Sequence, residues 1–400
     1  MRNAKCVMRN DEGISFERAI ELLTAHVKEI SDVEEVSLIN SVGRVAAENY
    51  IATFDNPPFD RSPLDGYALK SSETPGKFKV IGEECAGNFF SGEVQSGEAL
   101  RIMTGAAIPQ GCDCVIRQED VTFDGENIFV WQKLRHHENY CFAGEDIKAG
   151  ALLVAKDTRL TAAHVAILAS QGVARVKVYR RPRIAIASTG DELIQPGEKI
   201  SAGKIYNSNL YLLAARLVEL GFDPKILYNL PDDADACAEK ISSLETDLLI
   251  TTGGVSVGKK DIMHDVVKKI GERIFWRVLI KPGAPVIGWT CGNFLGVALS
   301  GNPFAAYATF ELLTRPVLAK LSRRADILYK RSRGVLANDF PKKSFGRRFI
   351  RAKFDGEKIF LPSRHESGSL YSAAECNAIV DIPAGSDELK AGAEVEIILL

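Results

Sequence analysis

The chain has 400 residues, a formal net charge of −2 and a hydrophobic fraction of 46%. This length exceeds that of one ordinary domain, so two to four domains are expected. The near-neutral charge gives no basic footprint, and we predict no nucleic-acid partner. No apolar run approaches a membrane span and the start lacks the apolar core of a secretory signal, so we predict a cytoplasmic protein without a membrane partner.

The cysteine pattern argues against metal and redox chemistry. Eight cysteines are present, none in a Cys-x-x-Cys pair, and no HExxH motif occurs. Cys112 and Cys114 have the spacing of alternate residues on one face of a strand, which favours buried thiols over metal ligands. His136 and His137, flanked by charged residues, indicate an exposed loop.

The first part of the chain contains two short helical patterns of similar size. Residues 15–30 predict an amphipathic helix, with Ser15 as its cap and Leu23 and Val27 facing inward. A second helix is predicted to begin at Thr161, with Ala163, Ala166 and Ile167 inward, and to end at Gly172. We therefore predict a helical N-terminal domain split between residues 12–50 and 148–180.

The segment between these helices has a different character. Residues 54–68 combine three prolines with two phenylalanines, a tyrosine and several acids, which is typical of a structured loop. Short apolar runs separated by glycines follow from residue 77 to about residue 130. Residues 51–147 are therefore predicted to form an inserted β-rich subdomain.

Strand and helix patterns alternate regularly beyond Arg181 and Pro182. Such alternation predicts a doubly wound parallel sheet covered by helices on both faces, here over residues 181–325. Residues 328–400 return to a β pattern and predict a C-terminal β-barrel-like domain without catalytic residues of its own. The predicted strands are 183–188, 225–230, 247–252, 294–299 and one near 277–281, and the predicted helices are 208–220, 232–243, 261–270 and 303–321.

Three loops of the α/β domain carry polar residues where a strand ends: 188–192, 253–261 and 300–303. The carboxyl ends of parallel strands share one sheet edge, where ligands bind. Glycines in the second loop allow close backbone approach to an anion, and in the third loop Asn302 would cap a helix whose first residue is Pro303. We therefore predict a nucleotide- or phosphate-type site at this edge.

Carboxylates beside this edge predict a metal ion. Glu192 and Asp261 would add negative charge next to bound phosphate, which usually implies a bridging divalent cation, most simply Mg²⁺. The stretch from Gly253 to Lys260 is one residue away from a Walker A loop, with Lys260 where Ser or Thr should hold the ion. This mismatch excludes an ordinary kinase or ATPase.

Seven motifs occur in order along the chain: PPFDRSPLDGYA, RIMTGAAIPQGCD, GEDI, RPRIAIASTGDEL, TTGGVSVGKKD, KPGAP and SGNP. Together they resemble the molybdopterin molybdenumtransferase family, the MoeA-type group that includes the E domain of gephyrin. The resemblance extends from about residue 12 to the end of the chain. It implies a four-part subunit and a homodimer, with an active site between the α/β domain of one subunit and the N-terminal part of the other.

The resemblance implies insertion of molybdate into adenylylated molybdopterin with release of AMP, assisted by Mg²⁺. A molybdopterin adenylyltransferase would be the upstream partner. By motif match the catalytic set is Asp65, Thr104, Asp146, Glu192, Asp261 and Lys281, with Glu192 and Asp261 as metal ligands and Lys281 as an anion contact. The implied pterin and phosphate contacts are Thr189, Gly253, Gly254, Ser256, Gly258, Gly301 and Asn302.

The chain departs from the family pattern in three places. Ala284 stands in KPGAP where many members carry a second lysine, Ser300 replaces the proline of PGNP, and Pro63-Leu64 occupies a position that is usually Ala-Met. Losing a lysine removes a charged contact from an oxyanion site. Candidate substitutes are Arg61, Lys259, Lys260 and Arg364.

Three alternative functions stay open at this point. A molybdopterin adenylyltransferase would share the α/β module, but the flanking domains favour insertion. A non-catalytic pterin-binding scaffold would have no reason to keep acids such as Asp65 and Asp146 facing an anion site, where like charges repel unless a cation is present. A relative that handles tungstate is the third alternative.

Overall fold

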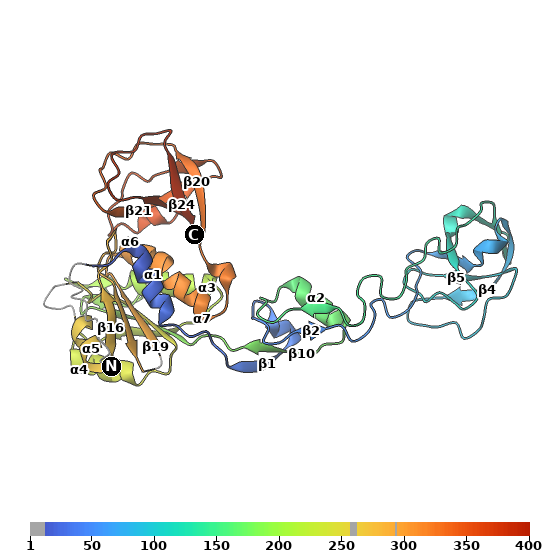
Figure 1. The fold of residues 1–400 in the computed structure, drawn as a ribbon, viewed down its shortest axis with the longest axis horizontal. Coiled ribbons are helices and arrows are strands. Elements are labelled where there is room, and N and C mark those ends of the chain that lie inside the picture. Colours follow the sequence, from blue (N-terminus) through green and yellow to red (C-terminus); the bar gives the residue numbers. More distant parts are fainter. Residues whose placement is uncertain (1–12, 257–261, 293) are drawn as a thin grey trace, which may run out of the picture. The chain divides into compact units, whose positions relative to one another are not determined.

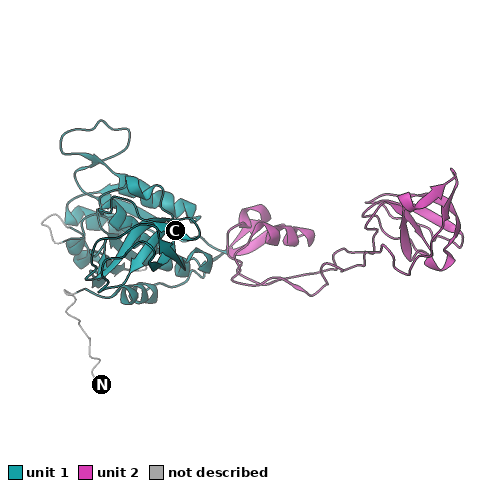
Figure 2. Ribbon diagram, turned by 90° about the horizontal axis from the view of Figure 1, so that it is seen from above, with its two compact units in different colours: residues 1–33, 179–400 teal, residues 34–178 magenta. Residues whose placement is uncertain are grey.

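The computed structural model describes residues 13–256, 262–292 and 294–400. It contains two compact units, one within residues 1–33 and 179–400 and the other within residues 34–178 (Figures 1 and 2). The chain passes from one unit to the other twice. Two paired strands, β1 (Val33–Ser37) and β10 (Arg175–Tyr179), form these passages.

The first unit is built on a six-stranded sheet in the order β14-β11-β15-β19-β18-β16. The first four strands are mutually parallel, as predicted, whereas β18 runs antiparallel to both β19 and β16. The prediction of an all-parallel sheet is therefore wrong at this edge, where the unpredicted β18 returns the chain directly beside β19. The strands are β11 (Ile184–Thr189), β14 (Lys225–Leu230), β15 (Leu248–Thr252), β16 (Glu272–Trp276), β18 (Ile287–Cys291) and β19 (Phe294–Leu299).

Helices cover both faces of this sheet, which confirms a doubly wound domain (Figure 1). Alternate side chains of each strand enter opposite cores, so Ile184 and Ile186 pack with α1, α3, α6 and α7, whereas Ala185 and Ala187 pack with α4 and α5. The helices are α1 (Phe16–Ala25), α3 (Ser208–Glu219), α4 (Ala234–Ser242), α5 (Met263–Ile270), α6 (Pro303–Thr309) and α7 (Arg315–Leu321).

Helix α1 belongs to the α/β core and not to a helical domain with residues 148–180. The Oγ of Ser15 accepts a hydrogen bond from the N–H of Arg18 at 3.2 Å, as predicted for the cap. Phe16 and Leu23 are buried in the same core as Ile184. The predicted domain boundary differs here because the apolar stripe of α1 packs on the large sheet core of the first unit.

The segment predicted as one long helix contains a buried ion cluster. A π-helical turn, Phe310–Thr314, separates α6 from α7. Within it, Glu311 is fully buried and accepts hydrogen bonds from Arg216 Nε at 2.6 Å and Arg315 Nη1 at 2.8 Å. Because Arg216 lies on α3, this cluster joins two helices that cover one face of the sheet.

The C-terminal strands close into a five-stranded barrel, which confirms the predicted barrel-like domain. The sheet order is β17-β21-β22-β20-β24-β23, and a further pairing of β21 with β23 closes the ring. Strand β17 (Ile280–Lys281) comes from the α/β domain and pairs with β21, placing Lys281 opposite Arg348. The barrel strands are β20 (Lys330–Leu336), β21 (Arg347–Phe354), β22 (Lys358–Phe360), β23 (Ala378–Ile382) and β24 (Glu394–Leu399).

The second unit contains a six-stranded sheet in the order β6-β3-β5-β4-β8-β7, a two-stranded sheet of β2 and β9, and one α-helix, α2 (Ala162–Ser170). Thr161 caps α2, but Ala163 and Ala166 are exposed and only Leu168 of the helix is buried. The predicted inward face is wrong because α2 is apolar all round and its pattern cannot select a face. The strands are β2 (Tyr50–Ile51), β3 (Gly66–Leu69), β4 (Gly76–Glu84), β5 (Glu98–Ile102), β6 (Cys114–Arg117), β7 (Val121–Phe123), β8 (Asn127–Val130) and β9 (Leu152–Val154).

The buried ion cluster predicts a large effect of a nearly isosteric change. Glu311→Gln leaves two arginines without their carboxylate and lowers the free energy of unfolding of the first unit by about 3 kcal/mol. Urea unfolding followed by tryptophan fluorescence measures this loss in a Trp131→Phe background. The two remaining tryptophans, Trp276 and Trp289, both lie in the six-stranded sheet of the first unit. Glu219→Gln, which changes an exposed partner of the same Arg216, costs no more than about 0.5 kcal/mol, and equal losses in the two variants would contradict the prediction.

Candidate functional site

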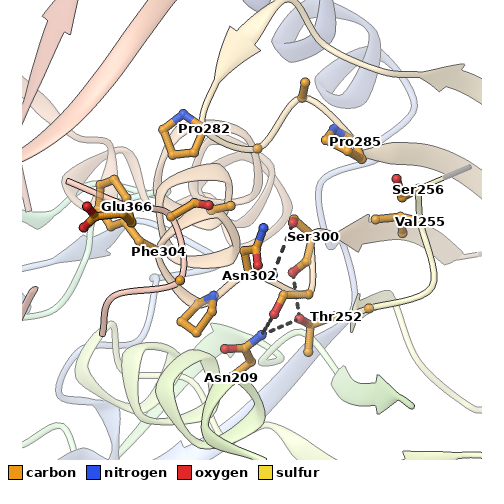
Figure 3. Close-up of a pocket in the computed structure, with 18 of the residues that line it drawn as sticks. Asn209, Thr252, Val255, Ser256, Pro282, Pro285, Ser300, Asn302, Phe304 and Glu366 are labelled. Atoms are coloured by element: carbon orange, nitrogen blue, oxygen red, sulfur yellow. Dashed lines mark hydrogen bonds between the residues drawn. The ribbon is translucent and has the colours of Figure 1, made fainter. Parts of the chain in front are cut away.

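A pocket of about 1150 Å³ opens at the carboxyl ends of the parallel strands of the first unit. Its lining comes from the loops after β11, β15 and β19, from the KPGAP segment 281–285, and from barrel segments near 340–351 and 365–368. The site predicted at this sheet edge therefore has a second wall, formed by the barrel (Figure 3).

Hydrogen bonds fix the loops after β15 and β19 to each other (Figure 3). The Oγ1 of Thr252 donates to the carbonyl of Ser300 at 3.0 Å and accepts from Asn209 Nδ2 at 3.2 Å. The same Nδ2 donates to the carbonyl of Gly301 at 2.7 Å. Asn209, on α3, therefore positions both loops, a role that the sequence analysis missed.

The glycine pair after β15 is required by close packing between loops. Gly253 and Gly254 have φ values of 93° and 67°. A Cβ on Gly253 would lie 2.7 Å from the carbonyl oxygen of Thr189, and one on Gly254 would lie 2.8 Å from Thr189 Oγ1. That hydroxyl is buried and has no hydrogen-bond partner among the described residues, although Thr189 belongs to the pocket lining.

The structure brings most of the predicted binding residues together. The pocket lining includes Thr189, Glu192, Gly253, Gly254, Ser256, Lys281, Gly301 and Asn302. Asn302 occupies the cap position of α6 with Pro303 next, but its side chain makes no cap hydrogen bond. Gly258 and Asp261 lie outside the described residues.

The other three predicted residues belong to the second unit. Asp65 Oδ1 accepts hydrogen bonds from both the backbone N–H and the Oγ1 of Thr104, each at 2.7 Å. These two bonds lower the pKa of Asp65, so its exposed carboxylate is ionised at neutral pH. Asp146 Oδ2 accepts from Asn56 Nδ2 at 3.2 Å. Two members of the predicted catalytic set, Asp65 and Thr104, are thus in direct contact.

The barrel wall supplies a buried arginine that the sequence analysis did not find. Arg351, only 1% exposed, donates through Nη2 to the carbonyl of Glu366 at 2.8 Å and lies over the ring of Phe304 at 4.2 Å. Its Nε and Nη1 are buried without a partner in the part of the chain that the structure describes, and burial lowers its pKa. A buried cation in this state favours an anionic ligand, because burial of an unpaired charge is costly.

Further cations line the same pocket, although Ala284 itself brings none. Lys281, Arg348 and Lys342 all line the pocket. Two arginines and a lysine of this lining come from the barrel, in which the sequence analysis had found no catalytic residues. None of the four candidate replacements for the missing lysine is found in the described lining. Arg61 is in the second unit, Lys259 and Lys260 lie outside the described residues, and Arg364 is absent from the lining.

Two carboxylates line the side of the pocket that the α/β domain forms. Glu192 and Asp232 both line the pocket, and Asp232 Oδ2 accepts the N–H of Asp191 at 3.1 Å. Mg²⁺ is commonly held by one or two carboxylates together with substrate phosphates. No group of three or more potential metal ligands occurs within residues 13–256, 262–292 and 294–400, so the described protein atoms do not form a complete cage.

The glycine turn gives a prediction with a matched control. Gly253→Ala forces a Cβ against Thr189 in addition to the strain of a positive φ. Gly197, with a φ of 96° and open space around its Cβ, carries the strain alone. We expect Gly197→Ala to cost about 1 kcal/mol of unfolding free energy and Gly253→Ala at least about 1 kcal/mol more, measured by urea unfolding. Equal costs would show that the contact with Thr189 relaxes.

Family models match almost the whole chain. The MoeA N-terminal region (domain I and II) matches residues 14–172, a probable molybdopterin binding domain matches residues 185–320, and the MoeA C-terminal region (domain IV) matches residues 333–400. Together they cover the sheet of the second unit, the pocket-bearing α/β domain and the barrel.

Similar proteins agree with these matches. A molybdopterin molybdenumtransferase of Staphylococcus epidermidis is 34% identical over 402 residues, covering 96% of this chain and 95% of the relative. One of Staphylococcus aureus is 35% identical over 380 residues, covering 91% and 90%. The crystal structure of a molybdopterin biosynthesis MoeA protein from Pyrococcus horikoshii matches with a TM-score of 0.84 and 30% identity, covering 97% of this chain and 99% of that one. By sequence, by domain content and by fold, the chain belongs to the MoeA family.

Proposed function

We propose that the chain is a molybdopterin molybdenumtransferase, which inserts molybdate into adenylylated molybdopterin and releases AMP. The observation that carries this proposal is the buried guanidinium of Arg351, whose Nε and Nη1 have no partner among the described residues and which lines the same pocket as the glycine turn of β15. The relatives of that name, at 34% and 35% identity over nearly the full length, support it.

The pocket suits a reaction between two groups of anions. The Gly253–Gly254 turn and the hydroxyl of Thr189 offer close contacts to the phosphates of the substrate. Lys281 and Arg351 would hold the molybdate oxyanion, and their fixed positive charge would stabilise the charge that develops as AMP leaves. Neutralising a crowded set of anions is thus the main contribution of the protein.

Magnesium is part of this proposal. Glu192 and Asp232 would hold the ion, with Asp261 as the further ligand that the resemblance predicts. When bound, Mg²⁺ supplies positive charge between the phosphate oxygens. Which cation binds can be measured by AMP release in the presence of Mg²⁺, Mn²⁺ or a chelator.

We also propose a cytoplasmic homodimer that receives its substrate from a molybdopterin adenylyltransferase. Self-association is supported by the apolar surface of the second unit, where Ile39 is 72% exposed and Leu152 56%, and where Ala163 and Ala166 of α2 are also exposed. None of the described helices is both long and apolar enough to cross a membrane.

Two other functions remain to be separated by experiment. A molybdopterin adenylyltransferase would consume ATP and molybdopterin and release pyrophosphate. A pterin-binding scaffold would bind the adenylylated pterin and release nothing. The barrel wall argues for insertion, because its buried Arg351 provides an anion subsite beyond the glycine turn. The decisive assay gives the purified chain adenylylated molybdopterin and Mg²⁺, with and without molybdate, and follows AMP.

The Asp65 carboxylate gives the first prediction for this assay. Asp65→Asn keeps a carbonyl oxygen that can accept both hydrogen bonds from Thr104 and removes the negative charge. We expect molybdate-dependent AMP release to fall at least about a hundredfold, with an unchanged unfolding transition. AMP release near the wild-type rate would remove Asp65 from the mechanism.

The second prediction concerns the buried arginine. Arg351→Met keeps much of the side-chain volume and removes the charge and its donors. We expect molybdate binding, measured by calorimetry, to weaken by about a hundredfold, as expected for losing charge-assisted hydrogen bonds. Arg364→Met is the matched control, because Arg364 lies in the same loop region outside the described lining. If both variants bind molybdate like the wild type, Arg351 is not an anion ligand.

A further inference from the structure

His365 lies beside Arg351 in the barrel wall of the pocket. Its ring packs edge-to-face against Phe340, with ring centroids 5.6 Å apart and an interplanar angle of 85°. Its Nδ1 is buried and has no hydrogen-bond partner among the described residues. Packing therefore fixes the ring in the pocket lining while its buried Nδ1 has no partner among the described residues.

The charges that face this ring are mostly positive. Burial lowers the pKa of His365 first, and Lys342, Arg351 and Arg348 lower it further, whereas Glu366 opposes them. The imidazole is therefore neutral at neutral pH when no anion is present. A dianion placed among these cations would reverse the electrostatic part of this balance and favour the imidazolium.

We propose that His365 is a proton-linked ligand of the oxyanion that Arg351 binds, so that the anion enters the pocket together with a proton. This inference rests on the proposed function and adds a residue that determines how tightly the oxyanion is held. Both ring nitrogens of the imidazolium are donors, so a buried Nδ1–H can bond an oxyanion oxygen. The imidazolium charge of His365 forms only when an anion is present to balance it. Without an anion, the pocket therefore does not have to bury a further cation.

The sign of the pH dependence follows from linkage. If anion binding raises the pKa of His365, the complex binds more protons than the free protein at any pH between the two pKa values. Affinity then increases as pH falls through this interval and levels off below it. The change amounts to about tenfold in affinity for each unit by which the pKa rises.

Titration calorimetry of the full chain with sodium molybdate tests this directly. In two buffers of different ionisation enthalpy at about pH 7.5, the wild type should take up protons on binding molybdate. Its affinity for molybdate should rise several-fold as the pH falls from about 8.5 to about 6.5. His365→Gln keeps a side-chain donor of similar length that cannot titrate, and it should lose both the proton uptake and the pH slope. His136→Gln, which changes an exposed imidazole beside Asp113 in the second unit, should keep both.

The outcomes separate this inference from the proposed function. Equal proton uptake in the wild type and His365→Gln would overturn the role of His365 and leave the anion subsite intact. An absence of molybdate binding in the wild type, together with no molybdate-dependent AMP release, would overturn both. If His365→Gln shifts the unfolding transition, NMR titration of the wild-type imidazole decides instead. A His365 pKa that rises on adding molybdate supports the inference, and an unchanged one overturns it.

Discussion

The pairing of β17 with β21 is the contact on which the site depends. Two residues of the α/β domain, Ile280 and Lys281, add to the edge of the barrel and align Lys281 with Arg348. A second backbone bond, from the N–H of Phe304 to the carbonyl of Ser367 at 2.9 Å, joins the start of α6 to the opposite barrel loop. The sheet edge thereby becomes a pocket with two walls.

The two walls carry opposite net charge, although Lys281 belongs to the first and Glu366 to the second. Glu192 and Asp232 lie among the loops of the α/β domain, whereas Arg348, Arg351 and Lys342 come from the barrel. Under the proposed function, a substrate with phosphates would need a cation beside the first wall, and a free oxyanion would be attracted to the second. The buried state of Arg351 is unfavourable for the isolated protein, and under the proposed function a bound anion would relieve it. Stability and binding are therefore opposed at this residue, as at many functional sites.

The sequence predicted the elements and the sheet edge because both follow from local patterns. Apolar runs ending in Thr-Gly-Gly or Ser-Gly-Asn mark strand ends, and the structure places Thr189, Gly253 and Asn302 around one pocket. It did not predict the barrel wall, because the approach of residues far apart in the chain leaves no local pattern. One signal was present: Arg351 lies in a run of buried positions on β21, where a charge needs a partner. The packing of α1 in the α/β core was missed for the same reason, because an amphipathic pattern predicts a buried face but does not identify the core against which it packs.

The double passage through β1 and β10 has a consequence for the order of folding during synthesis. Residues 34–178 form a unit that is complete before any strand of the α/β sheet has been made. Helix α1 precedes that unit, yet it packs with α7, which ends at Leu321. The apolar face of α1 therefore has no packing partner in α7 until most of the chain has left the ribosome. The inserted unit can fold early and independently, whereas the pocket-bearing unit closes late through contacts between distant parts of the sequence. A nascent chain arrested within the α/β domain would present that unpaired helix to chaperones.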